Sequence, residues 1–280
     1  MNKIRAKKSL GQHFLIDKNI ARNIANSLII NENADDKKAN VIEVGGGTGV
    51  LTEFLEKQDI ELSVVEIDNE AVEILKMKFP NLINKIYHDN FLKMRLEQIS
   101  ESKIHIIGNF PYNISSQIFF KVLENREKVS QVVCMIQKEV ASRICSEKGN
   151  KVYGIMSVLL QAFYDVEYLF TVSENVFSPP PKVKSAVIRL IKKEKSVLNC
   201  NEKLFFQIVK ASFNHRRKTI KNSLKSFLGN IDNTVENNLL KMRPEQLGVE
   251  EFNDLTKFVE NLMDLKVRKE QSENENELEL

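Results

Sequence analysis

Hydrophobic and polar residues follow two different patterns along the chain. From about residue 40 to 192, short runs rich in Val, Ile and aromatic residues alternate with segments in which apolar residues recur at three- and four-residue steps. Several short runs are continuously apolar, which is typical of strands buried on both faces of a parallel sheet. This alternation predicts an α/β fold with helices on both faces of the sheet. The predicted strands are 41-VIEV, 62-LSVVEI, 83-INKIY, 104-IHII, 131-QVVCMI, 166-VEYLFTV and 184-KSAVIRL, and the predicted helices cover residues 50–57, 69–78, 114–124 and 153–163.

The β pattern ends near residue 195, in the charged stretch KKEKSVLNCNE. Beyond it, phenylalanine and leucine recur at helical spacing in the runs 202–228, 235–241 and 252–265. The last residues are rich in glutamate, a composition typical of a disordered, solvated tail. We therefore predict an α/β domain with a basic N-terminal arm over residues 1–195, a small all-helical domain over 196–267 and a disordered acidic tail over 268–280.

The composition places the chain among ordinary globular proteins. Its 280 residues are 42% hydrophobic and 28% charged, enough to bury a core. No apolar run approaches the roughly 20 residues of a membrane helix, and the basic N-terminus lacks the apolar core of a secretory signal. Cys134, Cys145 and Cys200 lack the spacing of a metal site or of a disulfide framework. We therefore expect a cytoplasmic protein with no metal and no membrane contact.

Positive charge is concentrated in two segments. The net charge is only +3, but residues 3–8 hold four basic side chains and no acid. Residues 203–231 hold seven Lys or Arg, one His and no acid. Segregated positive charge is typical of a protein that binds a polyanion, although either segment alone is also compatible with a solvated face.

The first predicted strand runs into a glycine loop, 43-EVGGGTG-49, and a helical segment follows. Gly45, Gly47 and Gly49 permit a tight turn and the close approach of a ligand to the backbone. The loop is not a P-loop, since no Gly-Lys-Ser/Thr follows, and it fails the dinucleotide fingerprint because position 50 is Val. Its acidic-x-G-x-G-x-G form resembles the first motif of the S-adenosylmethionine-dependent methyltransferases, whose cofactor has no phosphate.

Two carboxylates follow at the ends of the next predicted strands. Glu66 lies 17 residues after Gly49, close to the spacing of about 20 at which an acid accepts hydrogen bonds from the ribose of an adenosyl cofactor. Asp89 is placed to accept from the adenine amino group, although alone it could equally cap a turn. Ligands of open α/β sheets bind at the carboxyl ends of the strands, so these positions predict one cofactor site.

The string 108-GNFPYNIS-115 follows the fourth predicted strand, beside the expected cofactor site. An exocyclic base amine is a poor nucleophile because its lone pair is delocalised into the ring. The side-chain carbonyl of Asn109 and the main-chain carbonyl of Phe110 would accept its N–H bonds and favour tetrahedral geometry in the transition state. Pro111 fixes the backbone, and Tyr112 offers a ring on which a flipped-out base can stack. The string therefore predicts methyl transfer to a base amine.

Together, the motifs of the chain resemble those of one family. They are 8-KSLGQHFLID-17, 43-EVGGGTG-49, 108-GNFPYNIS-115, 177-FSPPPKVKS-185 and 213-FNHRRKTIKNSL-224. Over residues 5–265 the chain resembles the KsgA/Dim1 family of ribosomal RNA adenine dimethyltransferases. The resemblance implies a Rossmann-like class I methyltransferase sheet in a catalytic domain, followed by a helical RNA-binding domain. It also implies S-adenosylmethionine as cofactor and S-adenosylhomocysteine as product, and it makes ribosomal RNA in the immature small subunit the expected partner. We expect a monomer.

The resemblance also implies roles for single residues. Cofactor contacts are expected at His13, Leu15, Gly45, Gly47, Glu66, Asp89 and Asn109. The catalytic motif is expected at Asn109, Phe110, Pro111 and Tyr112, with Phe177 closing over the target base from the other side. RNA contacts are expected at the basic side chains, which bind phosphates without reading sequence: Lys7, Lys8, Arg216, Arg217, Lys218 and Lys221.

These features predict an enzyme that dimethylates two adjacent adenines in the hairpin loop near the 3′ end of 16S ribosomal RNA. Three alternatives stay open: a large-subunit (23S) RNA methyltransferase of the macrolide-resistance type, a ribosome-assembly factor whose chemistry is secondary, and a DNA adenine methyltransferase. The strings LGQHFL and NHRRKT argue against the first alternative. The complete NFPY motif argues against a purely non-catalytic protein, and the helical domain argues against DNA as the substrate.

Overall fold

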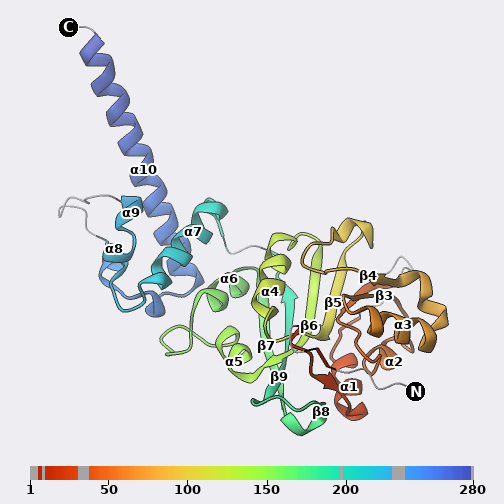
Figure 1. Ribbon diagram of the computed structural model, residues 1–280. Coiled ribbons are helices and arrows are strands. Elements are labelled where there is room, and N and C mark those ends of the chain that lie inside the picture. Colours follow the sequence, from red (N-terminus) through yellow and green to blue (C-terminus); the bar gives the residue numbers. More distant parts are fainter. Residues whose placement is uncertain (1–5, 8–9, 31–37, 196–197, 229–236, 279–280) are drawn as a thin grey trace. The chain divides into compact units, whose positions relative to one another are not determined.

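In the computed structural model, which describes residues 6–7, 10–30, 38–195, 198–228 and 237–278, seven strands form one sheet in the order β4-β3-β2-β5-β6-β9-β7 (Figure 1). Strands β2 to β6 pair in parallel, whereas β9 is antiparallel to both of its neighbours. The predicted α/β fold is confirmed. The antiparallel strand was not predicted, and it arises because β9 follows β7 without a crossover helix. The strands span Ala39–Val44 (β2), Ile60–Glu66 (β3), Ile86–His88 (β4), Ile104–Asn109 (β5), Val129–Gln137 (β6), Tyr164–Val172 (β7) and Ser185–Lys192 (β9).

Helices α1 to α5 accompany these strands. α1 begins where the Asp17 carboxylate accepts hydrogen bonds from the backbone N–H groups of Asn19 and Ile20. Neither α1 nor α5 was predicted, although Ala21, Ile24 and Ala25 of α1 recur at helical spacing and are buried. The first three helices contribute to one buried hydrophobic cluster with the sheet. The helices span Lys18–Ala25 (α1), Thr52–Leu55 (α2), Asn69–Lys78 (α3), Ser115–Glu124 (α4) and Lys138–Ile144 (α5).

Hydrogen bonds continue past the carboxyl ends of the parallel strands and hold the following residues level with one another. The N–H of Gly45 donates to the carbonyl of Val65 at 2.8 Å, and the N–H of Asp89 donates to the carbonyl of Glu66 at 3.1 Å. On the other side of β2, Phe110 is likewise bonded to the next strand. The residues that end β2, β3, β4 and β5 are therefore fixed at one edge of the sheet.

A second, two-stranded sheet ties the N-terminal arm to the loop that follows β7. β1 (Phe14–Leu15) pairs antiparallel with β8 (Phe177–Ser178), and Leu15 lies opposite Phe177. Both of these side chains are buried in the main hydrophobic cluster. This pairing brings the arm back across the sheet, towards the strand ends that carry the predicted site.

Contacts group the chain into two compact units. The first consists of Met1–Cys145 and Tyr164–Lys193, and the second of Ser146–Phe163 and Glu194–Leu280. The grouping differs from the predicted division at residue 195, since α6 (Ile155–Phe163) belongs to the second unit. The reason is aromatic packing: the ring of Phe163 stacks on that of Phe206, with centroids 6.0 Å apart.

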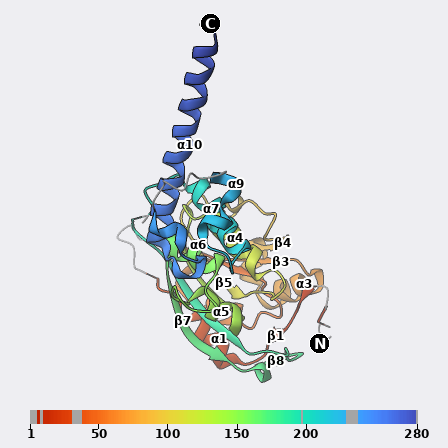
Figure 2. The ribbon, with the colours of Figure 1, turned by 90° about the vertical axis from the view of Figure 1, so that its left-hand side faces the viewer.

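The second unit is helical. Its core includes Phe213, whose ring centroid lies 6.1 Å from that of Tyr153 and 5.9 Å from that of Phe252. Helix α10 runs on to Leu278 (Figure 2), although residues 268–280 were predicted to be disordered. Glutamate, lysine and arginine are good helix formers, and extending an existing helix needs no new nucleus. The C-terminal helices span Glu202–Asn214 (α7), Ile220–Ser223 (α8), Lys225–Leu228 (α9) and Val249–Leu278 (α10).

No helix in the described part of the chain is both long and apolar enough to cross a membrane. Among the same residues, no group of three or more His, Cys, Asp or Glu side chains is arranged to hold a metal ion.

Candidate active site

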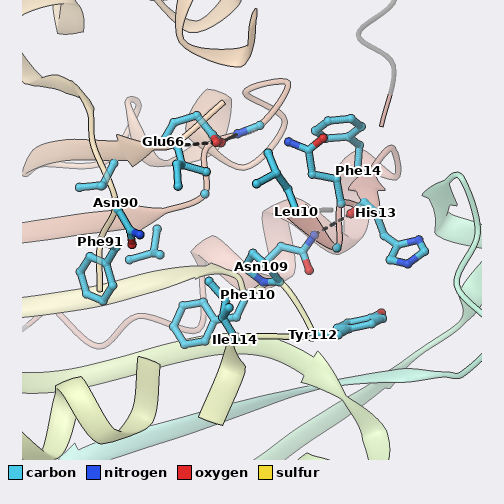
Figure 3. Close-up of a pocket in the computed structure, with 18 of the residues that line it drawn as sticks. Leu10, His13, Phe14, Glu66, Asn90, Phe91, Asn109, Phe110, Tyr112 and Ile114 are labelled. Carbon is cyan, nitrogen blue, oxygen red and sulfur yellow. Dashed lines mark hydrogen bonds between the residues drawn. The ribbon is translucent and has the colours of Figure 1, made fainter. Parts of the chain in front are cut away.

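A pocket opens at the carboxyl ends of β2, β3 and β5, where open α/β sheets bind their ligands (Figure 3). It contains about 750 Å³ of space, part of it open to solvent, which is within the usual range for a small-molecule site. The structure brings most of the predicted site residues together in its wall: His13, Gly45, Gly47, Glu66, Asp89, Asn109, Phe110, Pro111 and Tyr112.

The glycine loop borders this pocket with bare backbone. Gly45 and Gly47 have φ angles of 79° and 53°, in the left-handed region that other residues rarely adopt. A Cβ atom on Gly47 would lie only 3.1 Å from the ring of Phe14. The Gly47 N–H donates to Oε2 of Glu66 at 2.8 Å, so the loop is tied to the carboxylate of the neighbouring strand.

Glu66 is almost fully buried, and the backbone fixes its carboxylate. Besides the bond from Gly47, its Oε1 accepts from the N–H groups of Ile67 and Asp68, both at 2.8 Å. Burial raises the pKa of Glu66, and the three N–H bonds oppose that rise. A carboxylate has about four lone-pair sites. Glu66 therefore keeps acceptor capacity for the hydroxyl groups of a ribose.

The loop after β4 supplies three neighbouring residues to the pocket, of which only Asp89 was predicted. Asn90 and Phe91 also line it, and the aromatic residue directly after a strand-end acid is the sequence feature that could have indicated this. Behind the loop, Nζ of Lys121 lies 5.7 Å from the centroid of the Phe91 ring. The same ammonium donates to the carbonyls of Leu92 at 3.3 Å and Met94 at 2.5 Å, so Lys121 holds the loop in place.

The N-terminal arm forms another wall of the pocket, from Leu10 to Phe14. Gln12 fastens it: its Nε2 donates to Oδ2 of Asp68 at 2.9 Å, and its Oε1 accepts from the N–H of Lys7 at 2.8 Å. Lys7 also reaches Asp68, with 2.6 Å between Nζ and Oδ1. Sequence reasoning assigned no role to Leu10, Gln12 or Phe14, because these contacts join residues more than 50 positions apart.

Asn109 and Tyr112 lie where the arm meets the NFPY segment. Nδ2 of Asn109 donates to the main-chain carbonyl of His13 at 3.0 Å. The imidazole of His13 stacks on the ring of Tyr112, with centroids 5.4 Å apart and 29° between the planes. Phe110 is 1% exposed, and its ring packs edge-on against Phe119 of α4, which leaves its main chain as the part available to the pocket.

Two predicted residues of the first unit are core residues. Phe177 is 3% exposed, does not line the pocket and packs in the hydrophobic cluster. Pairing with β1 accompanies this burial, and the role of Phe177 at the target base stays a prediction. Leu15 is also buried, and it lines a smaller cavity beside the pocket together with Gly45, Gly47 and Asn109.

The predicted RNA-binding residues have different environments. Lys7 does not offer a free charge, since it forms ion pairs with Asp68 at 2.6 Å and Glu70 at 3.0 Å. Lys8 lies outside the described residues. In the second unit, Arg216 is half-buried and donates to the carbonyl of Asn150 at 3.2 Å, whereas the other three predicted residues are exposed: Arg217, Lys218 and Lys221.

The site combines three features. They are a glycine loop that lacks the P-loop pattern, a buried carboxylate that can still accept a hydrogen bond from a ribose, and the NFPY motif at the end of β5. On this sheet, these features define a class I S-adenosylmethionine-dependent methyltransferase. A family model described as ribosomal RNA adenine dimethylase matches residues 3–261. The chain belongs to the ribosomal RNA adenine dimethylase family, which confirms the predicted resemblance.

Individual relatives are similar over nearly their whole length. The chain is 53% identical over 261 residues to the ribosomal RNA small subunit methyltransferase A of Flavobacterium johnsoniae, covering 93% of this chain and 98% of the relative. It is 52% identical over 264 residues to the protein of the same name from Bacteroides thetaiotaomicron, and the match covers 94% of this chain and 97% of the relative.

Solved structures agree on the fold. A dimethyladenosine transferase from Plasmodium falciparum superposes with a TM-score of 0.75 at 24% identity, covering 89% of this chain and 98% of that one. The 23S rRNA methyltransferase ErmE superposes with a TM-score of 0.63 at 22% identity, and the match covers 86% of this chain and 99% of ErmE. At such identities the likeness shows the fold alone.

Proposed function

We propose that this enzyme dimethylates the exocyclic amines of two adjacent adenosines in the 3′-terminal hairpin loop of 16S ribosomal RNA, within the immature small subunit. The observation that carries the chemistry is the fixed orientation of the Asn109 amide. Its Nδ2 is bonded to the carbonyl of His13, and a carbonyl can only accept (Figure 3). The amide oxygen is therefore left to accept a hydrogen bond from a ligand in the pocket.

The acceptors of the NFPY segment would activate the amine. S-Adenosylmethionine supplies the methyl group and leaves as S-adenosylhomocysteine. Oδ1 of Asn109 and the main-chain carbonyl of Phe110 would accept hydrogen bonds from the two N–H groups of the adenine amine. These hydrogen bonds favour a tetrahedral nitrogen whose lone pair is directed at the methyl carbon. With the cofactor bound, a nitrogen–carbon bond would form as its sulfur–carbon bond breaks. The methylated nitrogen then loses a proton to water, so no strong general base is needed.

Tyr112 suits a stacking role better than an acid–base role. Burial raises the pKa of its phenol, which therefore stays neutral at physiological pH. The hydroxyl is paired with Oγ of Ser185 at 2.5 Å, which anchors the ring from its far end. A ring held in this way offers a flat face for a flipped-out adenine beside Asn109.

The names of the relatives support the small subunit as the source of the RNA, and exposed basic residues support a nucleic-acid substrate in general. Relatives about 50% identical to this chain bear the name of small-subunit methyltransferases, whereas the likeness to a 23S enzyme is one of fold. The exposed Arg217, Lys218 and Lys221 are suited to bind phosphates of the RNA. We infer a cytoplasmic monomer that needs no metal.

Replacing Asn109 by alanine tests the chemistry. Asn109→Ala should lower kcat by more than about 100-fold, because an acceptor used in the transition state is lost. Binding of the RNA should stay nearly unchanged in a filter-binding assay. Asn23→Ala, on the exposed face of α1, is a matched control that should keep full activity. Retained turnover in Asn109→Ala would contradict the mechanism.

The substrate is tested by supplying radioactive S-adenosylmethionine with isolated small subunits, isolated large subunits or duplex DNA. Methyl incorporation into adenines of the small subunit alone is the expected result. Incorporation into the large subunit would instead favour the 23S activity. Normal growth of a strain that carries only the folded but inactive Asn109→Ala variant would indicate that assembly is the main role.

A further inference from the structure

The N-terminal arm lies between the cofactor carboxylate and the catalytic amide of the proposed site. Nε2 of Gln12 is bonded to Asp68, and the N–H of Asp68 in turn donates to Oε1 of Glu66 at 2.8 Å. The next residue of the arm, His13, accepts the bond from the Asn109 amide at its main-chain carbonyl (Figure 3). Two successive residues of the arm therefore connect the two sides of the pocket.

Asp68 is a strong anchor for the arm. Its side chain is 0% exposed, and its Oδ1 accepts from Nζ of Lys7 at 2.6 Å and from the N–H of Glu70 at 3.1 Å. Its Oδ2 accepts from Nε2 of Gln12 at 2.9 Å. Burial alone would raise the pKa of Asp68, but the hydrogen bonds from Lys7 and Gln12 bring it below its ordinary value, so the carboxylate is ionised at neutral pH. Because an ionised carboxylate can only accept, Gln12 must present the N–H side of its amide.

Other contacts leave Gln12 little freedom to move. Its Oε1 accepts from the N–H of Lys7 at 2.8 Å, so both ends of the amide are used. The preceding residue, Gly11, has a φ angle of 63°, and a Cβ atom there would lie 2.6 Å from Oδ1 of Asn113. The arm thus rests with bare backbone on the residue that follows the NFPY motif. A displacement of Gln12 would also displace the carbonyl of the next residue, His13.

We propose that Gln12 is a positioning residue for methyl transfer. Its bond with Asp68 fixes the arm, and the His13 carbonyl of the arm keeps the Asn109 amide oxygen directed at the target amine. A ribose bound at Glu66 restrains Asp68 and so tightens the same link. The inference rests on the proposed function, because it takes Asn109 to accept a hydrogen bond from the adenine amine.

Exchanging the donor and the acceptor of this bond tests the link with side chains of unchanged size. Gln12→Glu places a second carboxylate against Asp68 and should lower kcat about 30-fold, while the KM for RNA stays within about twofold. Asp68→Asn should also lower kcat, because one N–H group is then left facing another. In the double variant Gln12→Glu, Asp68→Asn, the new amide donates to the new carboxylate. The kcat of the double variant should return to within about threefold of the wild type.

Amide hydrogen exchange of the arm, measured by mass spectrometry with and without saturating S-adenosylhomocysteine, gives a readout that needs no RNA. Exchange over residues 10–14 should slow at least about fivefold on binding in the wild type and in the double variant, but much less in Gln12→Glu. Gln58→Glu is the matched control. It breaks a hydrogen bond to the Ala25 carbonyl, at 3.1 Å, in the same unit, and Gln58 does not line the pocket. This control should match the wild type in both measurements.

Other results would overturn the inference. An unchanged kcat in Gln12→Glu, or no recovery in the double variant, would show that the bond positions nothing in the reaction. Equal slowing of exchange in Gln12→Glu and the wild type would show that the arm is not linked to the cofactor site through Gln12. If the wild type transfers no methyl group to small-subunit RNA, the proposed function fails and the catalytic role of Gln12 fails with it. Methyl transfer by the wild type together with an unchanged kcat in Gln12→Glu would overturn the inference alone.

Discussion

Glu43 lies at the end of β2, just before the glycine loop, and is 1% exposed. Its Oε2 accepts a hydrogen bond from the hydroxyl of Thr52 at 2.7 Å. Burial raises the pKa of Glu43 to about 7 from an ordinary value of 4.5, and the nearby charge of Glu66 adds to the rise. Glutamine has the same shape, and its carbonyl oxygen can still accept from Thr52. Glu43→Gln therefore removes the ionisation with little other change.

The direction in which stability changes with pH follows from the linkage between proton binding and folding. The folded state holds the Glu43 proton more tightly than the unfolded state, so this group's stabilising contribution is complete below pH 4.5 and is lost as the pH rises to about 7. One pKa unit corresponds to about 1.4 kcal/mol, so the loss is about 3 kcal/mol over this interval. Glu43→Gln should gain stability relative to the wild type by about that amount between pH 4.5 and 8.

Urea unfolding of both proteins at several pH values, followed by circular dichroism, measures this difference directly. The pH dependence shared by all other groups cancels in the comparison. Glu53→Gln is the control, because Glu53 is only partly buried and its bond with Lys18 lowers its pKa, so the corresponding difference should not rise with pH. A flat difference for Glu43→Gln would show that the buried carboxyl does not titrate in this range, and the reasoning from burial would be refuted.

Two further variants test the loop behind the pocket and the basic surface of the second unit. Lys121→Met should weaken S-adenosylmethionine binding about fivefold in calorimetry without changing RNA affinity, since it removes about 1 kcal/mol of contacts that hold the Phe91 loop. Lys76→Met, at a partly buried position of α3, is the control and should have no effect. An equal loss of RNA affinity in Lys121→Met would point to general misfolding. The double variant Arg217→Gln, Lys218→Gln should reduce the slope of log affinity for RNA against log salt by about 1 to 2. An unchanged slope would exclude both side chains as phosphate contacts, and Lys57→Gln with Lys76→Gln in the first unit is the control pair.

The sequence was sufficient to predict the residues at the strand ends. Each of Gly45, Glu66, Asp89 and Asn109 ends or directly follows a parallel strand, and parallel strands place their carboxyl ends at one edge. Local pattern and general topology together determine these positions. The same reasoning explains why the glycine loop and its acidic partner could be assigned to one pocket before any coordinates were known.

The remaining features depend on contacts between distant parts of the chain. Phe177 follows β7 in a short strand whose orientation is set by pairing with Leu15, and no local pattern shows which way its ring points. The assignment of α6 to the second unit likewise depends on the contact between Phe163 and Phe206. An apolar helix has the same sequence pattern whether a sheet or another helix covers its face. Periodicity alone therefore could not assign α6 to one of the two units.

The N-terminal arm shows that a basic side chain counted from the sequence can be paired with acids that lie far from it in the chain. Lys7 was counted as positive charge for a polyanion, but its ammonium is neutralised by Asp68 and Glu70. Asp68 is buried, and its N–H also holds Glu66, so one residue supports both the cofactor carboxylate and the arm over the pocket. Lys7 therefore fastens the arm to the residue whose N–H also holds Glu66. Arg217 and Lys218 are exposed, so the salt dependence of RNA binding should respond to their replacement.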